Sequence, residues 1–164
     1  MIDQDTSRRP ASVGTSLLGV CVLLVIGGAM LIGIAQFLDG RHGISIPAHA
    51  SRVDVTLSDY RISAMPMMPI RHGRIAFVVR NTGRIPHELV VFRTDLAATS
   101  LPLRADGDAN EESPRLTSVV DSGASLASNQ TKVFVANLAP GHYVAVCNLP
   151  GHYRLGMRLD VSVR

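Results

Sequence analysis

The sequence predicts an all-β protein, an antiparallel β-sandwich or barrel that follows one long apolar N-terminal segment. After residue 40, short runs alternate polar and apolar residues, as half-buried strands do. Turns rich in Gly, Pro and Asn separate these runs, and no stretch there has the periodicity of a long amphipathic helix. Without helices to cover them, the sheets are expected to pack on each other.

The apolar segment at residues 13–38 contains no charged side chain. It exceeds the roughly 20 residues that a bilayer-spanning helix needs, so we expect a retained transmembrane anchor after a short tail at residues 1–12. Gly33 and Ala35 are small residues spaced as in a signal cleavage site, and a secreted protein remains the alternative. A domain after such a short tail is expected outside the cytoplasm, in the periplasm or at the cell surface.

The remaining chain divides into a linker at residues 39–51 and a folded domain at residues 52–164. Residues 94–128 combine Pro, Gly and acidic residues with few aligned apolar positions, and we expect a long surface loop there. The predicted strands of the domain lie at 52–57, 74–80, 87–92, 131–138, 142–147 and 157–164.

The charge pattern argues against nucleic-acid binding. The net charge of +3 rests on basic residues scattered along the chain, and aromatic residues make up only 4%. A nucleic-acid site requires a basic stripe or a stacking platform. A mildly basic surface suits an acidic protein partner or an anionic membrane instead.

The domain contains a single cysteine, Cys147, because the other one, Cys21, lies inside the apolar segment. The two are therefore not expected to form a disulfide. An unoccupied thiol in an exported domain is open to oxidation, which makes Cys147 a candidate metal ligand.

Cys147 begins a run of three potential metal donors at regular spacing: Cys147, His152 and Met157. Gly151 and Gly156 allow the chain to turn between them. Thiolate, imidazole and thioether groups favour copper over magnesium or calcium. Two imidazoles and one thiolate with a weak axial methionine make a blue copper site, so a second histidine must come from elsewhere.

His87 is the candidate for that second histidine. It follows the turn NTGRIP and opens the predicted strand HELVVF, where it shares the inward face with Leu89. Cys147 shares the inward face of its own strand with Ala145. The two side chains are therefore expected to converge at one end of the sandwich.

The segments NTGRIPHELVVF and LAPGHYVAVCNLPGHYRLGMRLDVSV resemble the cupredoxin family, the group of plastocyanin, azurin and sulfocyanin. The resemblance covers about residues 50–164 and implies a Greek-key β-sandwich with one type 1 copper ion. It implies equatorial ligands at His87, Cys147 and His152, and an axial ligand at Met157. Many members have Asn directly after the upstream histidine, where this chain has Glu88. A backbone N–H at residue 88 is still expected within reach of the cysteine sulfur.

Other metal sites fit the sequence less well. Methionine is a poor ligand for structural zinc. A dinuclear copper centre needs a second cysteine in the ligand loop, where residue 151 is glycine, and multicopper sites need His-x-His pairs, which the sequence lacks.

A copper with four protein ligands has no open position for a substrate, so we expect a one-electron carrier rather than an enzyme. The expected partners are redox proteins such as a membrane-bound oxidase or reductase. The electron is expected to leave through His152, whose expected apolar rim is Leu149, Pro150, Tyr153 and Leu155.

The alternative function is copper handling, in which a chaperone or resistance protein passes the ion on. The cluster Met65, Met67 and Met68 favours it, because thioethers bind Cu(I). A metal-free scaffold is a third interpretation. Of the other histidines, His142 lies an odd number of residues from Cys147 and is expected to face away from the metal; His42, His49 and His72 are expected to be ordinary loop residues.

Overall fold

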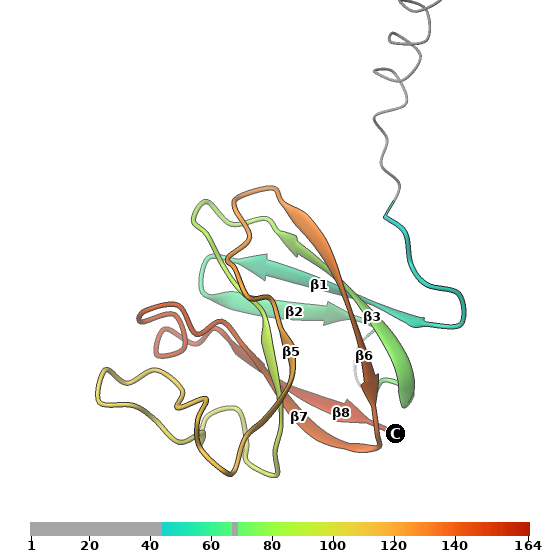
Figure 1. Cartoon of the computed structure of the whole chain (residues 1–164). Helices are drawn as coiled ribbons and strands as arrows, with labels where there is room; N and C mark the ends of the chain where they lie inside the picture. The colour runs from blue at the N-terminus through green and yellow to red at the C-terminus, as the bar shows by residue number, and fades with distance from the viewer. Residues whose placement is uncertain (1–43, 67–68) are drawn as a thin grey trace, which may run out of the picture. The chain divides into compact units, whose positions relative to one another are not determined.

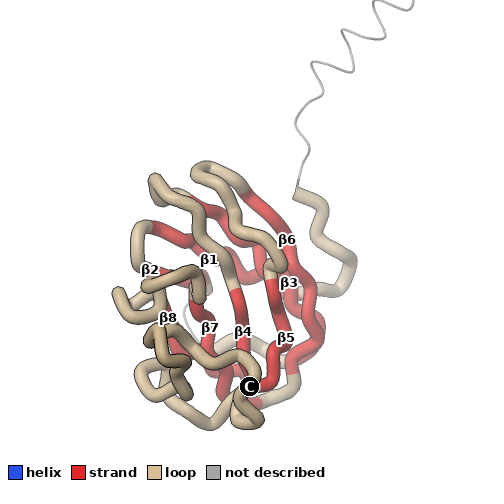
Figure 2. Tube along the Cα trace, turned by 60° about the vertical axis from the view of Figure 1, so that its left-hand side comes forward, coloured by secondary structure: helices blue, strands red, loops and turns tan. Residues whose placement is uncertain are grey.

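The computed structural model describes residues 44–66 and 69–164, which form eight strands in two four-stranded sheets. Figures 1 and 2 show these strands and no helix in the described part of the chain. The first sheet has the order β2-β1-β3-β6, with β1 at Ser51–Ser58, β2 at Arg61–Met65, β3 at Gly73–Asn81 and β6 at Thr131–Leu138. The second has the order β5-β4-β7-β8, with β4 at Val90–Arg93, β5 at Thr117–Asp121, β7 at Gly141–Val146 and β8 at Arg158–Val163. The all-β prediction is confirmed for these residues.

The predicted tail at 1–12, the predicted anchor at 13–38 and the first part of the linker, 39–43, lie outside the described residues. Within 44–66 and 69–164, no helix has the length and apolar character to cross a membrane. The anchor therefore stays a prediction.

One pair of neighbouring strands departs from the antiparallel arrangement that the sequence predicts: β1 and β3 run parallel, from Ser51 beside Ile75 onward. After β2, the chain passes the second sheet, where Ile70 forms a parallel bridge with Val163 of β8. It then enters the first sheet again on the other side of β1. Alternation of polar and apolar residues fixes which face a side chain takes, but not the direction of the strand.

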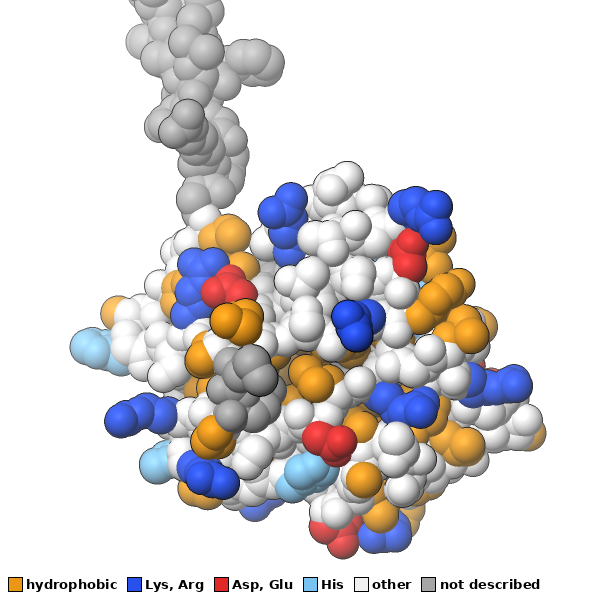
Figure 3. Space-filling model, turned by 180° about the vertical axis from the view of Figure 1, so that it is seen from behind, with side chains coloured by type: hydrophobic (Ala, Val, Ile, Leu, Met, Phe, Trp, Pro, Cys, Tyr) orange, Lys and Arg blue, Asp and Glu red, His pale blue; other side chains and the backbone are white. Residues whose placement is uncertain are grey.

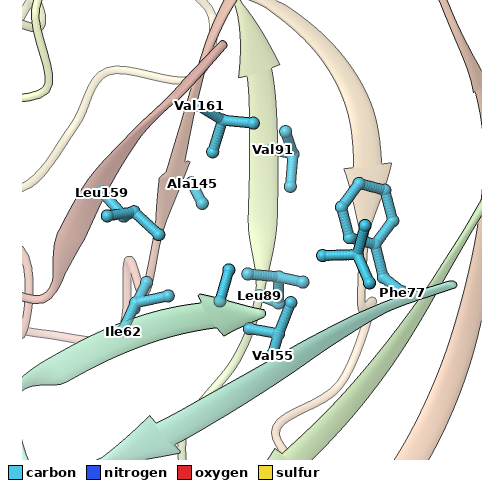
Figure 4. A pocket seen from close by; sticks show the side chains of 10 residues that line it. Val55, Ile62, Phe77, Leu89, Val91, Ala145, Leu159 and Val161 are labelled. Atoms are coloured by element: carbon cyan, nitrogen blue, oxygen red, sulfur yellow. The ribbon is translucent and has the colours of Figure 1, made fainter. Parts of the chain in front are cut away.

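The main core lies between the two sheets. Figure 4 shows Val55 and Phe77 from the first sheet converging with Leu89, Val91 and Ala145 from the second. All five side chains are buried. Burial of a side chain the size of valine, leucine or phenylalanine contributes about 1.5–3 kcal/mol, so this layer holds the sheets together.

The second sheet is also covered on its outer face. Val90, Phe92 and Val144 point away from the main core and pack in a second buried cluster with Leu101 and Leu116. We call residues 94–116, which supply this cover, the covering segment. Burial on both faces explains why the runs Val90–Phe92 of β4 and Tyr143–Val146 of β7 contain no charged residue and are buried throughout.

Two strands, β2 and β5, are absent from the predicted set. β5 lies inside residues 94–128, where the pattern predicts only a loop. Each strand has five residues with a single buried side chain, Ile62 in β2 and Val120 in β5. So little burial leaves almost no alternation to detect.

Candidate metal centre

The segment between β7 and β8 forms a compact loop that carries Cys147 at one end and Met157 at the other. We call residues 147–157 the ligand loop. The Cys147 N–H donates to the Met157 carbonyl at 3.0 Å, and the Met157 N–H donates to the His152 carbonyl at 3.1 Å. Gly151 and Gly156 have φ of 80° and 100°, which favour glycine. The expected turning role of both glycines is confirmed.

His87 reaches the site from a short segment before β4, rather than from the strand itself. It forms an isolated bridge with Leu126: the His87 N–H donates to the Leu126 carbonyl at 3.1 Å. Just upstream, the Asn81 side chain donates to the carbonyls of Ile85 and Leu126 at 2.8 and 2.9 Å. These bonds fix the backbone on both sides of the turn that delivers His87.

The two histidines and the cysteine converge as the sequence predicts. His152 Nδ1 lies 3.2 Å from His87 Nδ1 and 3.2 Å from Cys147 Sγ. One donor atom from each residue lies within 4.8 Å of the other two. His87 and Cys147 are fully buried, and His152 is partly exposed.

Met157, the predicted axial ligand, is fully buried in the same core cluster as Cys147. Its backbone bonds to both Cys147 and His152 place it at the base of the ligand loop. Its role as a ligand stays a prediction. His142, expected to face away from the metal, is not part of the donor group, and its ring nitrogens lie 2.9 Å from the Thr94 carbonyl and 3.1 Å from Asp160.

Burial changes the acid–base behaviour of two of these donors. It raises the pKa of the Cys147 thiol, since a thiolate loses its hydration there. It also lowers the pKa of His152, and the neighbouring His87 lowers it further. The site therefore offers a neutral imidazole, and a bound cation would compensate the buried thiolate charge.

Glu88, the residue that replaces the asparagine of many cupredoxins, connects the two ligand-bearing segments. Its backbone N–H donates to Cys147 Sγ at 3.4 Å, as the sequence predicts. Its carboxylate accepts the Asn148 N–H at 2.9 Å. Burial raises the pKa of this carboxyl group, and the bond from Asn148 opposes that effect.

Sequence reasoning missed Asp59 and Tyr60, which form the turn between β1 and β2. Asp59 Oδ1 lies 3.4 Å from His87 Nε2, and the ring of Tyr60 packs edge-on against that of His152, with centroids 5.3 Å apart. Hydrogen bonds from Arg84 lower the pKa of Asp59, so its carboxyl group is ionised. No local pattern in the sequence indicates this contact, because it depends on where the turn between β1 and β2 lies relative to His87.

The apolar rim of His152 differs from the predicted set in one residue. Leu155 and Pro150 are exposed and Leu149 is half-buried, as expected for a rim. Tyr153 is instead buried, and its hydroxyl donates to the Ala98 carbonyl at 2.7 Å. The covering segment, which hides Tyr153, is not evident from the sequence. Tyr60, 40% exposed, takes its place.

The donor set fits a single type 1 copper ion. Two imidazole nitrogens and one sulfur are the equatorial donors of such a site, and the three donor atoms here lie within 4.8 Å of one another. A buried thiolate that accepts a backbone N–H is also suited to a soft metal.

Comparison with protein-family models agrees with the blue copper family that the donor residues indicate. The family model described as the sulfocyanin (SoxE) domain matches residues 67–164, more than half of the chain. No curated protein sequence matches the chain.

Two solved auracyanin structures support the fold. Reduced auracyanin from the photosynthetic bacterium Roseiflexus castenholzii is 17% identical with a TM-score of 0.53, covering 70% of this chain and 98% of its own. Auracyanin B is 17% identical with a TM-score of 0.50, covering 75% and 95%. Reduced rusticyanin is 17% identical with a TM-score of 0.48, covering 73% and 82%.

Proposed function

Because the chain belongs to the sulfocyanin (SoxE) domain family, we propose that it is a type 1 copper protein that carries single electrons at the outer face of a membrane. The observation that carries the proposal is the convergence of His87, Cys147 and His152 within 4.8 Å. The cofactor is one type 1 copper ion, and Met157 is its proposed axial ligand. When bound, copper supplies a one-electron couple.

The protein's own part is to keep the donors fixed and dry. His87 and Cys147 are fully buried, so water has little access to the ligands. Hydrogen bonds hold the backbone on both sides of each donor. Donors that cannot move favour electron transfer, because little reorganisation then accompanies the change of charge.

The proposed electron exit is His152, the one partly exposed donor of the three. Tyr60 and Leu155 are 40% and 60% exposed and lie beside it, on the turn between β1 and β2 and in the ligand loop. A small apolar surface of this kind suits the brief contacts that redox partners make.

The proposed partners are redox proteins, including a membrane-bound oxidase or reductase. On the face shown in Figure 3, basic side chains are scattered and some lie beside acidic ones, so they form no basic stripe of the kind that a nucleic acid would need. The apolar segment 13–38 is the proposed anchor, and it would raise the effective concentration of the carrier near membrane partners.

The test is a visible spectrum and a potentiometric titration of the full-length chain loaded with copper in detergent. We expect an intense thiolate-to-copper band and reversible one-electron reduction without loss of metal. Cys147→Ser should abolish the band, whereas the control Cys21→Ser should retain it. A colourless Cu(II) protein, or a band that survives Cys147→Ser, would falsify the type 1 assignment.

Copper handling remains the alternative function. Of its proposed methionine cluster, Met65 is 62% exposed, and Met67 and Met68 lie outside the described residues. The same titration separates the two functions, because a copper-handling protein would release the reduced ion to a competing chelator. An electron carrier should retain it through repeated cycles.

A further inference from the structure

We propose that Asp59 is a positioning residue for His87 and lowers the reduction potential of the copper site through this ligand. The inference rests on the proposed function, since it requires copper to be bound by His87. The contact lies at Nε2 of His87, away from the other donors, and neither the family motif nor the spacing of the donors predicts it.

The two nitrogens of His87 face different partners. Nδ1 lies 3.2 Å from His152 Nδ1, inside the donor group. Nε2 lies 3.4 Å from Asp59 Oδ1, on the opposite side of the ring. With Nδ1 as the metal donor, Nε2 carries the proton and donates it in a hydrogen bond to the carboxylate.

The carboxylate is itself held in place from two directions. Asp59 belongs to the two-residue turn between β1 and β2, where Ser58 pairs with Arg61. The Arg84 backbone N–H donates to its Oδ1 at 2.8 Å, and Arg84 Nε donates to its Oδ2 at 3.1 Å. The carboxylate therefore approaches His87 as part of a fixed arrangement rather than as a mobile surface group.

Gly83 leaves the space in which this contact forms. A Cβ atom built on Gly83 would lie 2.8 Å from His87 Nε2 and closer still to Asp59 Oδ1. Any other residue at position 83 would push the carboxylate or the ring aside. The glycine at this position thus has a steric reason that involves both partners of the proposed contact.

A carboxylate on the remote N–H of a ligating histidine fixes the ring and makes the metal-binding nitrogen a stronger donor. A stronger donor favours the more highly charged state of the ion, Cu(II). Loss of such a partner commonly weakens metal binding about 10- to 100-fold. If a tenfold loss fell on Cu(II) alone, the reduction potential would rise by about 59 mV.

The test compares the full-length chain with Asp59→Asn, which keeps an oxygen acceptor but removes the charge. We expect the visible band to remain, the potential to rise, and Cu(II) affinity to fall about tenfold in competition with a chelator. The NMR signal of the His87 Nε2 proton in the reduced protein should move upfield, because its hydrogen bond weakens.

Asp54→Asn is the matched control. Like Asp59, Asp54 is an aspartate paired with an arginine, here Arg52. It lies in β1 and is not among the residues in contact with the donor group. This variant should leave the potential and the His87 signal unchanged.

An unchanged potential and an unchanged His87 signal in Asp59→Asn would overturn the positioning role, and so would equal shifts in Asp59→Asn and Asp54→Asn. In both cases a wild-type protein with its band intact leaves the proposed function standing. A wild-type chain without the band would instead overturn the function and this inference together.

Discussion

Glu88, which stands where many cupredoxins have asparagine, connects the segment of His87 to the ligand loop through both its backbone and its side chain. Its side chain accepts the N–H of Asn148, next to the cysteine, while its backbone N–H reaches the cysteine sulfur. The carboxylate thus links the segment of His87 to the ligand loop. The backbone bond does not depend on the identity of residue 88, but the side-chain bond does.

We predict that Glu88→Ala destabilises the metal-free protein by about 2 kcal/mol, because it leaves the Asn148 N–H without its charged acceptor. Glu88→Gln keeps an acceptor oxygen and relieves the cost of a buried charge, so its stability should stay close to that of the wild type. Urea unfolding of the metal-free chain measures both effects. Equal losses in the two variants would show that the charge, rather than the link, is what matters.

Among the individual donors, spacing and residue type were sufficient to identify His87, Cys147 and His152 as neighbours. Local features point to these residues, namely the alternation around His87 and Cys147 and the glycine-containing turn before His152, whereas their contact also requires the assembled second sheet. The contact between Asp59 and His87 could not be predicted, because it depends on where the turn between β1 and β2 lies relative to the second sheet. Such a long-range placement has no local signature.

At the scale of the elements, the covering segment has two roles that the sequence does not reveal. It buries the outer face of the second sheet, and it also holds the ligand loop. Asp108 accepts the Gly151 N–H at 2.9 Å, and the Asn148 side chain exchanges hydrogen bonds of 2.8 and 3.0 Å with the Ala109 backbone. Figure 1 shows the two loops side by side, in yellow and orange-red.

We predict that Asp108→Ala loosens the ligand loop without removing a donor. The protein should keep its visible band but lose copper to a chelator several-fold faster, and it should be about 1 kcal/mol less stable, because the partly buried N–H of Gly151 loses its acceptor. Stopped-flow chelation and urea unfolding measure these changes.

The control is Asp95→Ala in the same segment. Asp95 pairs with Arg115 on the surface, with its side chain 82% exposed, so its loss should cost under about 1 kcal/mol. If both variants release copper at the same rate, the covering segment does not hold the ligand loop.

The strands show how far the elements can be predicted from the sequence. The strands β1 and β8 are predictable because buried and more exposed positions alternate along them, and β3 because it is a longer run of buried apolar residues. β2 and β5 are not predicted by the pattern, because each strand buries only one side chain. The parallel pairing of β1 with β3 could not be predicted either, because no pattern within the two strands fixes their relative direction.

For the molecule as a whole, the site joins parts of the chain that are far apart in sequence. His87 precedes β4, whereas Cys147 and His152 follow β7, and the contact between them exists only when the second sheet is assembled. An unfolded chain cannot present the three donors together. Copper should therefore bind the folded state almost exclusively.

We predict that copper raises the thermal stability of the full-length chain. Binding to the folded state alone stabilises it by about 2.7 kcal/mol when free metal is 100 times the dissociation constant. For a domain of this size, that corresponds to a rise in Tm of roughly 10 °C. Calorimetry of the copper-loaded and the chelator-treated chain measures the shift. Cys147→Ser should lose most of the rise, and magnesium should produce none; a rise that survives Cys147→Ser would mean that copper stabilises the protein from another site.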